Sequence, residues 1–116
     1  MNIYHAFLSL KPEVADMAFV AALDDDLGHL KTRGNIAGWR LMRRKLGLGP
    51  RELRDFHLMI ELEELAQLDS AFLHVATRTG DVEATHHCVN HMVADVTFAL
   101  YRDFPDPVRE QGGELF

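Results

Sequence analysis

Alternating apolar and polar residues predict four short strands along the chain. The alternation is clearest over residues 55–63, where one face is wholly apolar and the other is mixed. The apolar face holds Phe56, Leu58, Ile60 and Leu62, and the mixed face holds His57, Met59, Glu61 and Glu63. An antiparallel sheet packs its apolar face against other elements. We therefore expect the mixed face to lie on the side of the sheet away from the helices.

Three further segments have strand character. Residues 2–10 are short, apolar and aromatic, and they end before Pro12. Their two faces hold Tyr4, Ala6 and Leu8 on one side and Ile3, His5, Phe7 and Ser9 on the other. Residues 36–46 place Trp39, Leu41 and Arg43 on one side and Arg40, Met42 and Arg44 on the other. Residues 96–104 are β-branched and aromatic, which indicates the fourth strand.

Helical spacing of apolar residues predicts two longer helices. The first runs over residues 12–33, because Pro12 suits the start of a helix and Gly34 suits its end. Its expected buried stripe is Val14, Met17, Val20, Leu23, Leu27 and Leu30. The second helix runs over 64–79, and its expected stripe is Leu65, Leu68, Phe72, Val75 and Ala76. A short helix should precede the last strand, and a single helix over 86–103 is the alternative.

The order of these elements is β-α-β-β-α-β, which defines a ferredoxin-like α+β domain with an antiparallel sheet. Right-handed crossovers place strands 2–10 and 55–63 at the centre and both helices on one face. The other face is bare and includes Met59. Because monomers rarely expose large apolar patches, we expect a homodimer that covers this face. The domain spans residues 1–104, and residues 105–116 form a C-terminal tail.

The composition fits one globular domain and argues against nucleic-acid and membrane partners. The 116 residues are 47% apolar and 26% charged, which is ordinary for a globular protein. The net charge of −6 argues against general binding of nucleic acid. No apolar run reaches the roughly 18–20 residues of a membrane helix, and the N-terminus does not look like a signal peptide. With one cysteine, Cys88, the chain is expected in the reducing cytoplasm, without a membrane partner.

Charge is unevenly distributed along the chain. Six of the twelve basic residues lie within residues 40–54, and an acidic cluster comprises Asp24, Asp25 and Asp26. A solvated surface is the simplest interpretation of both groups. An anion site or a charge-matched contact between subunits is the alternative.

His5 and His57 are the leading candidates for chemistry among seven histidines. Both are expected in the middle of central strands and on the bare face, together with Glu61. Histidine near a carboxylate can move a proton, so we predict His5, His57 and Glu61 as catalytic residues. Hydrogen-bonded groups in a core or an interface are the alternative. The predicted ligand-binding residues are Tyr4, Trp39, Arg40, Met59 and Tyr101.

A second cluster contains His86, His87, Cys88 and His91. His87 and His91 would share a helix face, but Cys88 stands where zinc metalloproteases of the His-Glu-x-x-His type have Glu. An ordinary helix with exposed histidines is therefore favoured over a weak metal site. The chain has no phosphate loop, dinucleotide fingerprint or Gly-x-Ser-x-Gly elbow. We predict no metal and no cofactor.

Four segments resemble a known family. They are residues 1–12, GWRLMRRKLGLGP (38–50), FHLMIE (56–61) and FALYRDFPDP (98–107). The chain resembles a small family of uncharacterised bacterial proteins in the dimeric α+β barrel superfamily. That superfamily includes cofactor-free monooxygenases, haem-degrading enzymes and EthD-like proteins, with pockets between sheet and helices or inside the dimer barrel. The resemblance implies a fold and a dimer, and it matches no catalytic motif.

Two functions remain open. The first is a protein that binds or transforms a small organic molecule in a cavity beside the sheet, as a cofactor-independent oxygenase, isomerase or lyase would. The alternative is a non-catalytic dimer with a structural or regulatory role that binds another protein through its charged surfaces. The sequence does not indicate the substrate.

Overall fold

The structure, a computed structural model, describes residues 1–76 and 87–105. The elements follow in the order β1 (Asn2–Leu10), α1 (Asp16–Thr32), β2 (Gly38–Arg43), η1 (Arg51–Leu53), β3 (Phe56–Leu62), α2 (Leu65–Ala76) and β4 (Val93–Arg102). Residues 87–92, just before β4, are also helical. No helix among the described residues combines the length and hydrophobicity needed to cross a bilayer. The succession of strands and long helices confirms the predicted β-α-β-β-α-β order.

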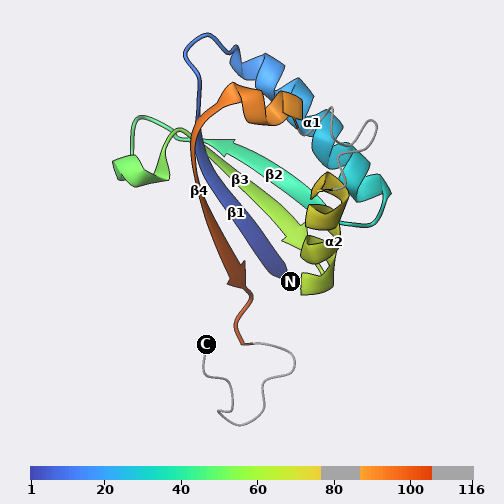
Figure 1. The fold of residues 1–116 in the computed structure, drawn as a ribbon. Helices are drawn as coiled ribbons and strands as arrows, with labels where there is room; N and C mark the ends of the chain where they lie inside the picture. Colours follow the sequence, from blue (N-terminus) through green and yellow to red (C-terminus); the bar gives the residue numbers. More distant parts are fainter. Residues whose placement is uncertain (77–86, 106–116) are drawn as a thin grey trace.

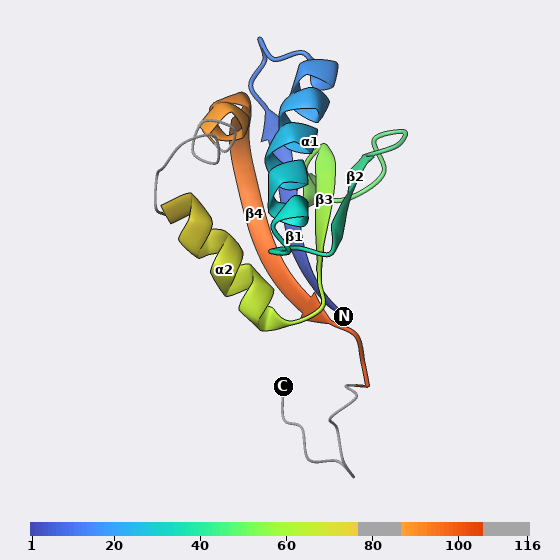
Figure 2. The same ribbon diagram turned by 90° about the vertical axis from the view of Figure 1, so that its right-hand side faces the viewer.

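β1 and β3 form the centre of one antiparallel sheet with the order β2-β3-β1-β4. Helices α1 and α2 lie on the same side of this sheet (Figures 1 and 2). The arrangement confirms the predicted ferredoxin-like α+β fold. It follows from the right-handed crossovers that α1 and α2 make between strands.

The register of the strands separates the side chains into two sets. Ala6 lies opposite Leu58 and Phe98, whereas its neighbour His5 lies opposite Met59 and Ala99. Successive side chains of a strand point to opposite faces, so the first set faces the helices. We call the other side the open face. Its side chains are Ile3, His5, Phe7, Ser9, Arg40, Met42, His57, Met59, Glu61, Asp95, Thr97, Ala99 and Tyr101.

The hydrophobic core lies between the sheet and α1. Phe19 of α1 and Leu62 of β3 are wholly buried, and the ring of Phe19 lies 5.8 Å from that of Phe56. The predicted stripe on α1 is right for Leu23, Leu27 and Leu30, which are also buried. It is wrong for Met17, which is 70% exposed. Residues two apart on a helix point about 200° apart, so burying Phe19 turns Met17 to solvent.

α1 and β4 begin at other residues than the sequence predicts. α1 begins at Asp16 rather than Pro12, because the Val14 N–H donates to the Lys11 carbonyl and closes a turn before the helix. β4 begins at Val93 and pairs with β1 along its length, so the alternative of one helix over residues 86–103 is wrong. The free edge of β1 offers this β-branched segment a full set of backbone partners. Residues 77–86 and 106–116, including His86 and most of the predicted tail, lie outside the described part.

α2 covers its side of the sheet only in part. Ala71 is buried, but Leu65 is 42% and Phe72 is 52% exposed, so much of the predicted stripe meets solvent. The side chains of Val75 and Ala76 lie outside the described part of the chain. Loose coverage of β4 by α2 leaves room beside the sheet.

The connection between β2 and β3 projects on the side of the sheet away from the helices (Figure 1). The predicted strand 36–46 ends at Arg43, because Leu46 and Gly47 adopt positive φ angles of 57° and 65° and turn the chain. Leu46 and Leu48 are 82% and 75% exposed on this loop. The loop therefore borders the open face with exposed leucines.

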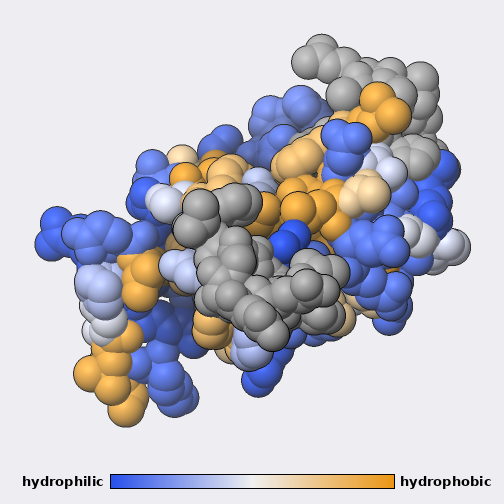
Figure 3. Space-filling view, turned by 90° about the horizontal axis from the view of Figure 1, so that it is seen from below, coloured by the Kyte–Doolittle hydropathy of each residue, from blue (hydrophilic) through white to orange (hydrophobic). Residues whose placement is uncertain are grey.

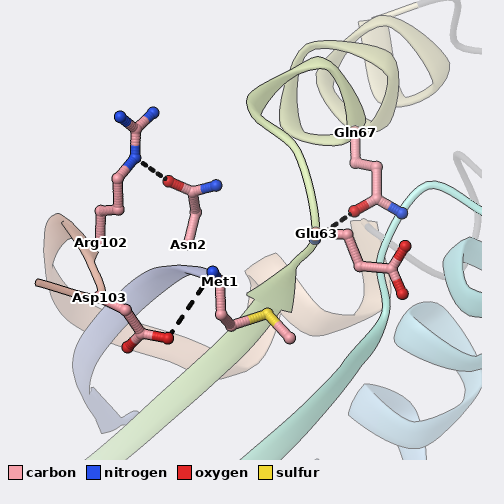
Figure 4. A network of polar contacts seen from close by, with 6 residues as sticks. All are labelled: Met1, Asn2, Glu63, Gln67, Arg102 and Asp103. Atoms are coloured by element: carbon pink, nitrogen blue, oxygen red, sulfur yellow. Dashed lines mark hydrogen bonds and ion pairs between the residues drawn. The ribbon is translucent and has the colours of Figure 1, made fainter. Parts of the chain in front are cut away.

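Polar contacts hold the N-terminus and the beginning of α2 at one end of the sheet (Figure 4). The Met1 ammonium lies 3.6 Å from the Asp103 carboxylate, and Arg102 donates to the Asn2 side chain at 2.8 Å. At the start of α2, the Gln67 side chain accepts from the Glu63 N–H at 2.6 Å and donates to the Gly34 carbonyl at 3.0 Å. Gln67 thereby ties α2 to the turn after α1.

The first prediction concerns the face that α1 buries. Phe19→Ala should lower the free energy of unfolding by about 3–5 kcal/mol, because it empties a wholly buried ring position. Met17→Ala, at an exposed position of the same helix, should change it by less than about 0.5 kcal/mol. Urea unfolding followed by circular dichroism measures both values. Equal losses of unfolding free energy in the two variants would contradict the observed orientation of α1, which buries Phe19 and exposes Met17.

Candidate functional site

A cavity of about 190 Å³ lies on the helix side of the sheet. Most of its wall is apolar, built from β1, β3, β4, α1, α2 and residues 87–92. The polar side chains among its lining residues are Tyr4, Asp26 and Asn90. A mostly apolar pocket with a few polar groups is the usual form of a site for a small organic molecule.

Aromatic rings gather at one part of the cavity wall. The ring of Tyr4 stacks on that of Phe98 at 5.4 Å and meets the edge of Phe72 at 5.8 Å. Phe72 and Phe98 are 52% and 55% exposed, so this part of the cavity opens to solvent. Seen from below, hydrophobic residues lie near the middle of the molecular surface, and others lie at its lower left and upper right (Figure 3).

Burial gives Tyr4 a defined protonation state. Desolvation of its hydroxyl raises the pKa of Tyr4 above the ordinary value of 10.0. The phenol is therefore neutral at physiological pH and can donate as well as accept a hydrogen bond.

Asp26 is the acidic residue of the cavity wall, and its position corrects a prediction. The sequence places it in a solvated cluster with Asp24 and Asp25, which are indeed exposed. Asp26 itself is only 5% exposed and lines the cavity. Helical spacing contains the missing signal, because Asp26 lies three residues after buried Leu23 and four before buried Leu30.

The open face holds a pair of histidines. His5 Nδ1 and His57 Nε2 are 2.8 Å apart, so one ring donates a hydrogen bond to the other. Aromatic neighbours frame the pair, with Phe7 stacked on His57 at 4.3 Å and Tyr101 edge-on to His5 at 5.1 Å. The pairing of β1 with β3 brings these two strands together, as the proposed order of the sheet implies.

Partial burial favours the neutral form of both histidines. Desolvation lowers the pKa of His5 and of His57 below the ordinary value of 6.5, and at His57 the charge of His5 adds to the effect. A neutral ring has one N–H donor and one acceptor nitrogen, which is what the observed hydrogen bond requires. Protonation of both rings would leave no acceptor between them.

The sheet divides the predicted site residues between its two faces. His5 and His57 are in contact on the open face. Met59 lies opposite His5, and Arg40 lies opposite Met59 on the other side. Tyr101 joins them through its contact with His5, and Glu61 lies further along the same face, opposite Gly38 and Ile3. Tyr4 lies on the helix side, in the cavity wall. Trp39 shares that side, opposite Ile60, but it is not among the lining residues of the cavity.

Part of the basic segment 40–54 has a structural role. Arg43 pairs with Asp16 at the start of α1 and lies over the ring of Phe56 at 5.0 Å. Arg54 reaches to β4, where it donates to Thr97 at 3.2 Å and lies 4.0 Å from Asp95. Arg43 therefore joins the end of β2 to α1, and Arg54 holds the β2–β3 connection against β4, which favours a structural interpretation of both residues.

The structure describes three of the four residues of the second histidine cluster, namely His87, Cys88 and His91. The Nε2 atoms of His87 and His91 are 2.8 Å apart at exposed positions of the helix 87–92, and Cys88 is exposed. Within residues 1–76 and 87–105, no group of three or more His, Cys, Asp or Glu side chains is placed to hold a metal ion. His86 lies outside the described residues.

The chain is a ferredoxin-like α+β protein, because both long helices lie on one face of an antiparallel sheet. Solved structures support this class. The protein At3g17210 of Arabidopsis thaliana is similar, with a TM-score of 0.70 and 8% identity over 89% of this chain and 95% of that one. A dimeric ferredoxin-like protein of unknown function from Jannaschia sp. CCS1 is similar, with a TM-score of 0.65 and 13% identity over 89% and 100% of the chains. A hydroxynitrile lyase from Passiflora edulis has a TM-score of 0.62 and 12% identity over 91% and 96%.

The chain itself belongs to the family of unknown function DUF6614, whose sequence model matches residues 1–116. No curated protein matches the sequence. The family membership agrees with the predicted resemblance. Because the three solved structures are less than 25% identical to the chain, they establish its fold alone.

The second prediction concerns the histidine pair. A histidine whose native pKa lies below the unfolded value binds fewer protons in the native state, so its contribution to stability is full above about pH 6.5 and is lost as pH falls. The double variant His5→Gln/His57→Gln should therefore lose less melting temperature between pH 7.5 and pH 5 than the unmodified chain. Identical slopes for the double variant and the unmodified chain would show that the pair does not titrate as its surroundings imply.

Proposed function

We propose that this chain is a homodimer that binds a small organic molecule in the cavity on the helix side of its sheet. The cavity is the observation that supports this proposal most strongly, because it is apolar, opens to solvent and contains few polar groups. An apolar cavity of about 150 Å³ is known to bind benzene, so about 190 Å³ suits a single substituted ring. Tyr4, Phe72 and Phe98 offer aromatic surfaces to such a ring.

Chemical transformation of the ligand would need a group that gives or takes a proton beside it. Tyr4 and Asp26 have suitable side chains in the cavity wall. The fold is compatible with small-molecule chemistry, since one protein with a similar fold is a hydroxynitrile lyase. A cofactor-independent lyase or isomerase is therefore the type of enzyme that we propose.

The predicted catalytic group His5, His57 and Glu61 lies on the other side of the sheet from this cavity. These residues could act only on a molecule held against the open face. We retain them as a proposal for a ligand enclosed between two sheets of a dimer, with Arg40, Met59 and Tyr101 around it.

The homodimer is proposed from the open face. Ile3, Phe7, Met42 and Met59 leave apolar surface there, and Tyr101 is 66% exposed. Such a patch on one side of a sheet is typical of an interaction site, and a two-fold axis covers the same patch on both chains at once. The Jannaschia protein, which has a similar fold, is described as dimeric. The β2–β3 connection stands on the same side and would border the partner (Figure 1).

A non-catalytic dimer that docks another protein is the second candidate. The exposed Leu46 and Leu48 within the basic segment 40–54 favour it, since exposed leucines beside positive charges suit an acidic partner with apolar residues. On this alternative the cavity would take up no small molecule.

The third prediction tests the cavity. Toluene should raise the melting temperature of the protein, because a ligand that binds the native state stabilises it by mass action. Ala71→Phe places a ring into the cavity from α2 and should abolish the shift while the protein stays folded. Ala66→Phe, at an exposed position of the same helix, should keep the full shift. A toluene shift that survives Ala71→Phe would place the binding site elsewhere.

The fourth prediction tests the dimer. Light scattering after size-exclusion chromatography should give twice the mass of the 13.2 kDa chain at micromolar concentration. Met59→Arg should give monomers, because Arg40 lies opposite Met59 in the register and the two-fold axis would bring the added positive charges of both chains into one interface. Leu73→Arg, at an exposed position of α2, should stay dimeric. A monomeric unmodified chain, or dissociation of the Leu73 variant alone, would overturn the proposed interface.

A further inference from the structure

We infer that the cavity selects small aromatic molecules that carry an amine or hydroxyl group, and that Asp26 is the residue that selects them. The inference depends on the proposed function, since it names the ligand class of that same cavity. The observation behind it is a carboxylate within a mostly apolar wall.

The burial of Asp26 distinguishes it from its neighbours on α1. Asp26 is 5% exposed, whereas the side chain of Asp25, one residue earlier, is 68% exposed. Asp26 occupies the stripe that Leu23, Leu27 and Leu30 otherwise fill. A leucine there would pack without the cost of removing a carboxylate from water. An acidic residue in this position therefore gives the cavity wall a hydrogen-bond acceptor that a leucine would lack, in addition to the interaction that Asp26 makes within the protein.

A carboxylate has enough acceptor positions for a ligand as well as a protein contact. Its two oxygens offer about four lone-pair sites. A ligand N–H or O–H in the cavity could occupy one of these sites while the others serve the protein. Hydrogen bonds to an ionised group are about twice as strong as those between neutral groups, and a dry wall strengthens them further.

The other polar and aromatic residues fix the rest of the ligand. Tyr4 comes from β1, Asp26 from α1 and Asn90 from the helical residues 87–92, so the sheet and the helices both supply polar groups to the cavity. Tyr4 with Phe72 and Phe98 forms an aromatic cluster against which a ring can stack. The negative charge of Asp26 would repel a ligand carboxylate. The expected ligand is thus an aromatic ring with a donor group and without an acid group.

Four probes of similar size test the selection on the unmodified protein. Benzylamine, benzyl alcohol, toluene and benzoate differ mainly in the group attached to one ring, and calorimetry or NMR titration at pH 7.5 gives their affinities. Benzylamine should bind at least about tenfold more tightly than toluene, because one charged hydrogen bond is worth that factor or more. Benzyl alcohol should lie between them, and benzoate should bind more weakly than toluene. Equal affinities for benzylamine and benzoate would overturn the inference.

Two variants assign the selection to Asp26. Asp26→Asn keeps the shape and removes the charge, so it should cut the affinity for benzylamine about tenfold and change that for toluene less than about twofold. Asp25→Asn removes the neighbouring exposed charge and should change neither. Circular dichroism checks that the variants fold, and the probe series on the unmodified protein remains decisive if Asp26→Asn does not. Toluene binding without any preference among probes would overturn only this inference, whereas no binding of any probe would overturn the proposed function as well.

Discussion

A four-stranded sheet has two faces, and the helices of this chain can cover only one of them. The right-handed crossovers place α1 and α2 on the same side, so the alternation along β1 and β3 decides the environment of every side chain in the centre. Ala6 and Leu58 enter the core, while His5 and His57, one residue away in each strand, meet on the open face. A shift of one residue in the pairing would exchange these environments completely.

Because the helices cover only one face of the sheet, the proposed ligand cavity and the proposed partner surface lie on opposite sides of it. On the helix side, incomplete coverage of the sheet by α2 leaves an apolar cavity, with Asp26 as its buried acid. On the open face, a neutral histidine pair lies among aromatic and aliphatic side chains that a second chain would cover. A ligand on one side and a partner on the other would communicate only through the central strands. Tyr4 and His5 are adjacent in β1 but point to opposite faces, so each role could change with little effect on the other.

The sequence predicts the strands and the histidine pair well because the two-residue period of Phe56, Leu58, Ile60 and Leu62 is strict and the strand order follows from handedness. It predicts helix surfaces less well. Met17 and Phe19 are both apolar, and only the packing of the larger ring against Phe56 decides which one is buried. Asp26 is hidden among three consecutive acids, although its distance from Leu23 and Leu30 contains the signal. The positive φ of Leu46 cannot be predicted from its residue type, since leucine seldom adopts it.

Methyl NMR of the protein labelled at alanine and methionine tests the separation of the two faces most directly. Ala6 and Ala71 line the cavity, whereas Met42 and Met59 lie on the open face. Addition of toluene should shift the methyl signals of Ala6 and Ala71 and leave those of Met42 and Met59 in place. Dilution of the protein should do the reverse, because it would uncover the open face. Toluene shifts at Met59 as large as those at Ala6, together with no response of Met59 to dilution, would contradict the account.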